Sequence, residues 1–201
     1  VHDEDGLTDA LLLALDRYER DLHSTSHGQS LRNDNGSAKH EERLSDHLAQ
    51  WLGENLKLHR IRENQTVHGK REDITVVLNL PSRDSLALAV EVKKHDSDRL
   101  LEKMDSQLKE LYLKAQNRSH GIYVVFWFED GESPAHPGIG TFRQLTEYLA
   151  KQAVQLSKPP YRVCSKVIDC RASTMTPSDP HQKGRGPKCA KPRPPKSTRS
   201  T

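Results

Sequence analysis

Two acidic residues and one lysine are spaced in this sequence so that they could act together on a substrate. Glu91 and Lys93 lie in the strand-like segment 86–94, where side chains alternate and these two would share one face. A hairpin turn centred near Ser82 would put Asp73 directly opposite Glu91, with Cβ atoms about 5 Å apart. Two carboxylates at that separation destabilise the strand pair unless a cation lies between them. The spacing therefore predicts a divalent cation held by Asp73 and Glu91.

Paired carboxylates beside a lysine suit the hydrolysis of phosphodiester bonds. Mg²⁺ and Mn²⁺ take oxygen ligands, and Mg²⁺ is commonly held by one or two carboxylates together with water and substrate phosphate. Such an ion polarises the phosphate and lowers the pKa of its bound water, and a lysine beside it can orient that water. We therefore expect Lys93 to serve the attacking water. A register shift of one residue would turn Asp73 to the other face of the sheet, so this prediction depends on the turn.

The elements that must position these residues follow from hydrophobic periodicity. Apolar residues at helical spacing predict helices over residues 7–22, 40–56, 97–115 and 141–156, and strand-forming residues predict strands over 59–68, 73–80, 86–94, 121–128 and 161–169. Segment 121–128 is almost wholly apolar, which indicates a central strand that is covered on both faces. An antiparallel meander followed by crossover helices gives an α/β fold with a mixed central sheet flanked by helices.

Asp73 followed by Glu-Val-Lys at residues 91–93 resembles the PD-(D/E)xK nuclease superfamily, which includes restriction endonucleases and recombination exonucleases. The family core is a helix, a three-strand meander, a helix and a further strand, and it is similar to residues 40–128. This resemblance implies a restriction-endonuclease-like fold, with an additional helix and strand here. It also implies that Asp73 and Glu91 bind the metal ion and that Lys93 acts at the hydrolytic water.

One residue departs from the family pattern, because Glu72 stands where the pattern has proline. Four other residues extend the resemblance. Many members carry a glutamate on the first helix near the metal, for which Glu41 is the candidate and Glu42 the alternative. Exonuclease-like members carry a glutamine and a tyrosine on the helix after the lysine strand, similar to Gln107 and Tyr112. The spacing here is one residue longer than in the family. Gln107 would then contact DNA or the surroundings of the catalytic lysine, with a polar position at the edge of the core as its alternative. Tyr112 fits the core.

Several basic residues flank the proposed site. Lys94, Arg71 and Lys70 would supply a local positive field for DNA, and ordinary solvated charge is the alternative reading. His95 is expected on an exposed loop, and contact with phosphate is the alternative. Trp51 and Trp127 are expected in the core.

Composition divides the chain into three segments. Residues 1–39 are interpreted as an N-terminal helix and polar linker, residues 40–172 as the nuclease-like domain, and residues 173–201 as a basic, Pro-rich tail without packed structure. The net charge is +3, and seven of the basic residues lie in the tail: Lys183, Arg185, Lys188, Lys191, Arg193, Lys196 and Arg199. The tail either binds a polyanion or serves as a solubilising extension.

The remaining composition bears on the cellular setting. No run of about 18 apolar residues is present, and the N-terminal apolar stretch lacks the features of a signal peptide, so we expect no membrane association. Three cysteines, Cys164, Cys170 and Cys189, form neither a disulfide framework nor a zinc pattern, which favours reduced thiols in the cytoplasm. The chain begins with Val1 and can be part of a longer protein.

The sequence therefore predicts a Mg²⁺- or Mn²⁺-dependent nuclease that acts on DNA, in defence or repair. The second hypothesis is a module of the same fold that lacks catalysis and binds nucleic acid or a partner protein. A third is an unrelated α/β domain in which Glu91 and Lys93 form ordinary surface ion pairs. Members of the family work as dimers or as parts of larger proteins, and the sequence leaves both arrangements open.

Overall fold

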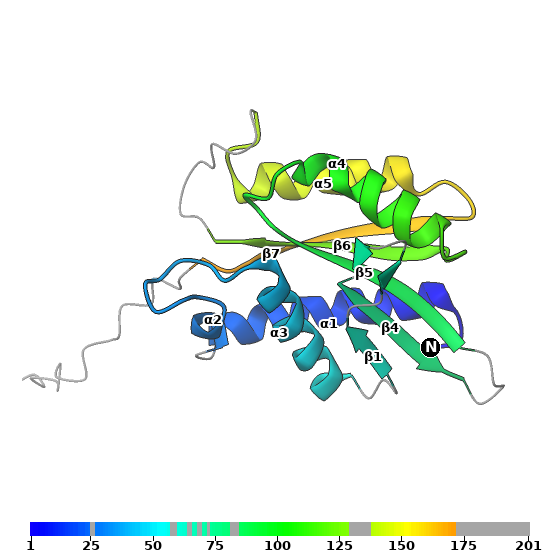
Figure 1. Ribbon diagram of the computed structural model, residues 1–201, viewed down its shortest axis with the longest axis horizontal. Helices are drawn as coiled ribbons and strands as arrows, with labels where there is room; N and C mark the ends of the chain where they lie inside the picture. Colours follow the sequence, from blue (N-terminus) through cyan, green and yellow to red (C-terminus); the bar gives the residue numbers. More distant parts are fainter. Residues whose placement is uncertain are drawn as a thin grey trace, which may run out of the picture.

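A mixed sheet with helices on both faces organises the chain in the computed structural model, which describes residues 1–24, 27–56, 60–63, 66–67, 70–71, 73–80, 85–128 and 138–171 (Figure 1). The helices are α1 (Glu4–Ser24), α2 (His27–Ser30), α3 (Glu41–Asn55), α4 (Leu100–Lys103), the π-helix η1 (Met104–Lys114) and α5 (Phe142–Leu156). The strands are β1 (Arg60–Glu63), β2 (Thr66–Val67), β3 (Lys70–Arg71), β4 (Ile74–Asn79), β5 (Ser85–Lys94), β6 (His120–Trp127) and β7 (Arg162–Asp169).

The main sheet has five strands in the order β1-β4-β5-β6-β7. The pairs β1–β4 and β4–β5 are antiparallel, whereas β5–β6 and β6–β7 are parallel. This arrangement confirms the predicted α/β fold with a mixed central sheet, in which a meander is followed by crossover helices. The strand predicted over 59–68 is wrong in detail, because it consists of two short strands, and β2 pairs with β3 in a separate two-stranded sheet.

Strand β5 separates two hydrophobic layers. Four alternate residues, Leu86, Leu88, Val90 and Val92, belong to the core that contains the buried faces of α1 and α3. Ala89 belongs to the opposite core, together with buried residues of α4, η1 and α5. Figure 1 shows α1 and α3 on one side of the sheet and α4 and α5 on the other. The alternation predicted from the sequence is therefore present, and Glu91 and Lys93 belong to the face of Ala89.

Helix α1 packs on the sheet as part of the same core as α3. Its residues at helical spacing, Leu7, Leu11, Ala14, Leu15 and Tyr18, are all buried. Acidic side chains of α1 also pair with β7: Arg162 contacts Asp5 and Asp9, and Lys166 contacts Asp16 and Glu19. Apolar packing and ion pairs thus both attach α1 to the sheet.

Within the described ranges, no helix combines the length and the apolar character needed to span a membrane.

The helix predicted over 97–115 begins at Leu100 and changes after four residues into the π-helix η1. In a π-helix the hydrogen bonds join residues five apart, so positions i and i+5 lie close together on successive turns. The buried residues of η1 are Met104, Leu108, Tyr112 and Leu113, which pack against β5 and β6. This helix type was not predicted from the sequence.

Gly121 of β6 allows this close packing of η1 on the sheet. A Cβ atom at this position would lie 2.9 Å from Leu108 Cδ1 and 3.2 Å from Leu113 Cδ2. Both leucines are completely buried, so neither can move without disturbing its neighbours. We expect Gly121→Ala to lower the free energy of unfolding by about 1 kcal/mol or more, as overpacking does elsewhere. Urea unfolding measures this change, and an unaltered free energy would contradict the packing described here.

Candidate active site

The candidate site lies where β5 continues past its antiparallel partner. Strand β4 pairs with β5 only as far as Val90, and among the described residues no other strand pairs with this edge of β5 beyond that point, so we call it the open edge. Two side chains use the backbone donors of this edge. The N–H of Val92 donates to Asp73 Oδ2 at 2.8 Å, and the N–H of Lys94 donates to Glu41 Oε1 at 3.2 Å. Backbone geometry therefore fixes one oxygen of each of two carboxylates at the end of the hairpin.

The register of this hairpin is the one predicted from the sequence. Its Cα partners run from Ile74 with Val90 to Asn79 with Ser85. One step beyond the Ile74–Val90 pair, at the open end of the hairpin, places Asp73 beside Glu91. Because the register does not slip, Asp73 and Glu91 are on the same face of the sheet.

The amine of Lys93 lies among three carboxylates. Its Nζ atom is 3.5 Å from Glu41 Oε2 and 3.9 Å from Asp73 Oδ2, and it forms an ion pair with Glu91 Oε1. Glu91 has no exposed surface, and Lys93 is only 5% exposed. The hypothesis that Glu91 and Lys93 form ordinary surface ion pairs is therefore wrong. Instead, Glu41, Asp73, Glu91 and Lys93 form a buried or partly buried cluster, which we call the carboxylate–lysine cluster.

Burial dominates the electrostatics of this cluster. Burial and the neighbouring Asp73 carboxylate raise the pKa of Glu91 to about 8, although Lys93 opposes this shift. Burial also raises the pKa of Asp73, against the opposing effects of Lys93 and the Val92 N–H. Burial alone would lower the pKa of Lys93, but the three carboxylates outweigh it and the pKa is raised. In the metal-free cluster these effects favour a proton on Glu91 and keep Lys93 charged.

The donors of the cluster fit a hard divalent cation. Glu91 Oε2 is buried and accepts no hydrogen bond from any residue that the structure describes. Among these residues, no three His, Cys, Asp or Glu side chains are placed to hold a metal ion by themselves. Mg²⁺ does not require such a cage, because one or two carboxylates with water and phosphate are its usual ligands in proteins. Asp73 and Glu91 supply that pair of carboxylates.

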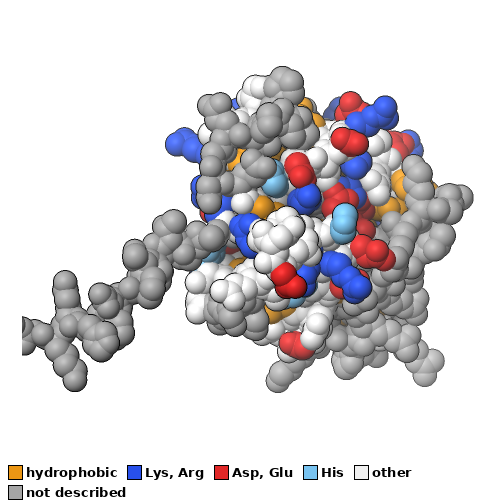
Figure 2. Space-filling model, turned by 60° about the vertical axis from the view of Figure 1, so that its left-hand side comes forward, with side chains coloured by type: hydrophobic (Ala, Val, Ile, Leu, Met, Phe, Trp, Pro, Cys, Tyr) orange, Lys and Arg blue, Asp and Glu red, His pale blue; other side chains and the backbone are white. Residues whose placement is uncertain are grey.

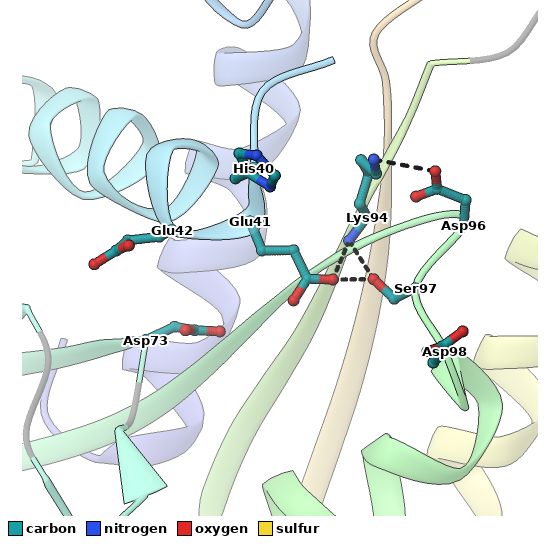
Figure 3. Close-up of a pocket in the computed structure, with 8 residues that line it drawn as sticks. All are labelled: His40, Glu41, Glu42, Asp73, Lys94, Asp96, Ser97 and Asp98. Atoms are coloured by element: carbon teal, nitrogen blue, oxygen red, sulfur yellow. Dashed lines mark hydrogen bonds and ion pairs between the residues drawn. The ribbon is translucent and has the colours of Figure 1, made fainter. Parts of the chain in front are cut away.

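A cleft of about 610 Å³ opens beside the cluster (Figure 3). It is lined by His40, Glu41, Glu42, Asp73, Lys94, Asp96, Ser97 and Asp98. Five of these eight side chains are acidic, so the cleft repels a polyanion unless cations neutralise it. On the face shown in Figure 2, acidic and basic side chains are mixed and form no continuous basic surface.

The two glutamates proposed on the first helix are distinguished by their orientation. Glu41 points toward Lys94 and Ser97, whereas Glu42 lines the cleft but points away from them (Figure 3). Lys94 also lines the cleft and pairs with Asp96 at 3.0 Å. Glu41 is therefore the helix carboxylate that joins the cluster.

The other predicted DNA contacts are placed differently. Gln107 lies on η1, where its amide donates to the Tyr112 hydroxyl at 3.0 Å, and it is not among the residues that line the cleft. Tyr112 is completely buried, as expected of a core residue. The backbone of Lys70 and Arg71 forms β3, and their side chains lie outside the described part of the structure.

The prediction that His95 lies on an exposed loop is wrong. Its side chain is buried, and its ring packs on Trp127 with ring centroids 4.9 Å apart. The physical reason is that β5 pairs with β6 to its last residue, and the N–H of His95 still donates to Phe126 O at 3.0 Å. Trp51 and Trp127 are buried, as predicted.

Ser97 is the contact of the cluster that the sequence did not indicate. Its hydroxyl donates to Glu41 Oε1 and accepts from the N–H of Lys94 at 3.2 Å. Asp96 and Asp98 beside it also line the cleft. The sequence signal that could have indicated Ser97 is the polar run at residues 96–98. This run follows the strand that carries Lys93, so its side chains lie close to the cluster.

Two assignments from the sequence concern the C-terminal region. The tail at residues 173–201 and Cys189 lie outside the described residues. Cys164 is half-buried and Cys170 is buried, and neither forms a disulfide within the described residues.

Comparison with known proteins identifies a family without an assigned activity. No curated protein and no solved structure matches the chain. One family model, described as "Domain of unknown function (DUF8371)", matches residues 7–130, which is more than half of the chain. The match begins in α1 and ends after β6, so it includes every member of the carboxylate–lysine cluster. The chain therefore belongs to the DUF8371 family.

Proposed function

We propose that this protein is a metal-dependent nuclease of the PD-(D/E)xK, restriction-endonuclease-like type, which hydrolyses phosphodiester bonds in DNA with Mg²⁺ or Mn²⁺. The observation that carries the proposal is the convergence of Asp73, Glu91 and Lys93 on one face at the open edge of β5. The third carboxylate, Glu41, reaches the same amine from α3. A structural ion pair needs one acid and one base, whereas this cluster collects three acids around one base.

Each residue has a role that follows from its position. Asp73 and Glu91 hold the cation, and the Val92 N–H keeps Asp73 Oδ2 in place. When bound, the cation lowers the pKa of a coordinated water and neutralises charge on the phosphate. Lys93 presents its ammonium next to both carboxylates, where it orients the attacking water or a phosphate oxygen. Glu41 holds Lys93 from the side of the cleft.

The charge of the cleft sets how DNA binds. Lys94 is the one lysine or arginine among the eight described residues that line the cleft, and it is paired with Asp96. Phosphate groups therefore meet net negative charge in the metal-free protein. DNA affinity is then expected to depend on the divalent cation as well as on ionic strength.

Cleavage assays with the full chain test this function. Supercoiled plasmid and linear DNA are incubated with Mg²⁺, with Mn²⁺, or with EDTA, and the products are separated by electrophoresis. The proposal expects cleavage with either ion and none in EDTA. Intact plasmid and intact linear DNA under all conditions would remove the nuclease assignment.

One observation favours a second candidate, a nuclease-fold module that binds nucleic acid or a partner protein without cutting. Glu91 is completely buried and already paired with Lys93, as in a cluster that serves structure alone. Such a module binds DNA equally well with and without the ion and leaves it intact. DNA binding measured by fluorescence anisotropy in Mn²⁺ and in EDTA separates the two candidates.

A further inference from the structure

Ser97 connects the loop after β5 with the first residue of α3. Its backbone N–H donates to Lys94 O at 3.0 Å, which closes a tight turn. Its hydroxyl then points back, accepting from the Lys94 N–H at 3.2 Å and donating to Glu41 Oε1. Figure 3 shows the Glu41 carboxylate directed at this pair.

The two oxygens of Glu41 consequently have different partners. Oε1 accepts from the Ser97 hydroxyl and the Lys94 N–H. Oε2 is the oxygen that contacts Lys93 Nζ, at 3.5 Å. Glu41 has a long side chain that is about one-third exposed at the edge of an open cleft. Without the Ser97 hydroxyl, Oε1 keeps only the Lys94 N–H and Oε2 keeps the long contact with Lys93, so the side chain is held less firmly against rotation into the cleft.

We infer that Ser97 is a positioning residue, which holds Glu41 Oε1 so that Oε2 stays directed at Lys93. The consequence for metal binding and cleavage rests on the proposed function. The orientation of Glu41 itself rests only on the contacts given above. Ser97 touches neither Asp73 nor Glu91 among the described contacts, so it acts through Glu41.

The test is a double-variant comparison of Ser97 and Glu41 in the full chain. Ser97→Ala removes the hydroxyl, Ser97→Thr retains it, and Glu41→Gln removes the charge that it orients. Ser106→Ala is the matched control, because the Ser106 hydroxyl donates to the Glu102 carbonyl at 3.0 Å on the outside of the helix. The readouts are Mn²⁺ affinity by calorimetry without DNA, kcat and KM for DNA cleavage, and Tm.

We expect Ser97→Ala to weaken Mn²⁺ binding and to lower kcat by roughly 10-fold each, as loss of an outer-shell partner does, with little change in KM. Ser97→Thr restores most of both values. In the Glu41→Gln background, Ser97→Ala has no further effect on either. Ser106→Ala matches the wild type.

Three results would overturn the inference while leaving the nuclease proposal intact. The first is a Ser97→Ala variant with the Mn²⁺ affinity and kcat of the wild type. The second is a Ser97→Thr variant whose Mn²⁺ affinity and kcat are as low as those of Ser97→Ala. The third is a double variant in which the losses of the two single variants multiply. If the wild type neither binds Mn²⁺ nor cleaves DNA, the proposed function fails. The positioning role of Ser97 is then tested by the Tm values of the single and double variants. A loss of Tm in Ser97→Ala that disappears with Glu41→Gln supports the positioning role, and additive losses refute it.

Discussion

Replacing Lys93 by methionine is expected to lower the rate of Mg²⁺-dependent DNA cleavage by about 10²- to 10³-fold, the usual cost of removing one preorganised donor from a hydrolytic site. Methionine keeps most of the buried stem and removes only the ammonium that contacts Glu41, Asp73 and Glu91. Because those carboxylates remain, the variant is expected to keep its cation while losing rate. Single-turnover cleavage and Mn²⁺ calorimetry separate the two effects.

The fold is expected to tolerate this replacement at neutral pH. Glu91 loses its ion-pair partner, but Lys93 is also the group that opposes the rise of its pKa, so the buried carboxyl becomes protonated more readily and needs no counter-ion. Lys114→Met is the matched control, since Lys114 pairs with Glu110 at 2.8 Å on the exposed side of η1. The control should cleave DNA at the wild-type rate. If Lys93→Met cleaves equally fast, Lys93 has no part in the chemistry.

The sheet and the hairpin were predictable because two independent signals agreed. The alternation in residues 86–94 assigned β5 its apolar and polar faces, and the turn near Ser82 set the pairing of β4 with β5. A slip of one residue would have turned Asp73 to the other face of the sheet, and the sequence left that register open until the structure showed the pairing of β4 with β5. The meeting of Asp73 with Glu91 follows from this hairpin alone and needs no distant contact.

Other features depend on contacts that local sequence does not encode. His95 is buried because β6 continues alongside β5, which no pattern around residue 95 reveals. Ser97 reaches Glu41 across more than fifty residues of sequence, from a turn closed by its own N–H and Lys94 O. The burial of His95 at the end of β5 therefore depends on how far the neighbouring strand β6 extends.

The pairing of Gln107 with Tyr112 shows how helix type changes the meaning of spacing. Five residues apart, these side chains would lie on different sides of an α-helix and only loosely match the family's glutamine–tyrosine pattern. In the π-helix η1 they meet, and the Gln107 amide bonds the Tyr112 hydroxyl. The five-residue spacing of Gln107 and Tyr112 matches one turn of the π-helix, so the two side chains lie together. Hydrophobic periodicity alone does not distinguish a π-helix from an α-helix in the sequence.

Replacing Glu91 by glutamine is expected to stabilise the metal-free protein at alkaline pH and to change it little at acidic pH. Below pH 4.5 the carboxyl is protonated in the folded and the unfolded chain, so its titration contributes no difference. Between pH 4.5 and about 8 the unfolded chain releases the proton while the folded protein retains it. The folded state therefore loses stability as pH rises through this window.

Glutamine has no such titration, so the advantage of Glu91→Gln grows from pH 4.5 and levels off above pH 8. One pKa unit corresponds to about 1.4 kcal/mol, and the raised pKa of Glu91 already includes its favourable ion pair with Lys93, so the gain at pH 9 is on the order of a few kcal/mol. Urea unfolding in EDTA between pH 4 and pH 9 measures it. The control Glu110→Gln removes an exposed carboxyl whose pKa its Lys114 partner lowers, so no such growing advantage is expected.

Addition of Mn²⁺ at alkaline pH should make the wild type more stable to unfolding than Glu91→Gln, the reverse of their order without the ion. The cation binds the ionised form of Glu91, so it stabilises the wild type more at pH 9 than at pH 7, where a proton competes for the same oxygens. Glu91→Gln lacks this ligand and gains less stability from the ion at either pH. A cluster that serves only structure would show the alkaline loss without the rescue by Mn²⁺. A stability difference that is the same at pH 4 and pH 9 would instead mean that Glu91 titrates as an ordinary exposed carboxyl, and the buried cluster would lose its electrostatic basis.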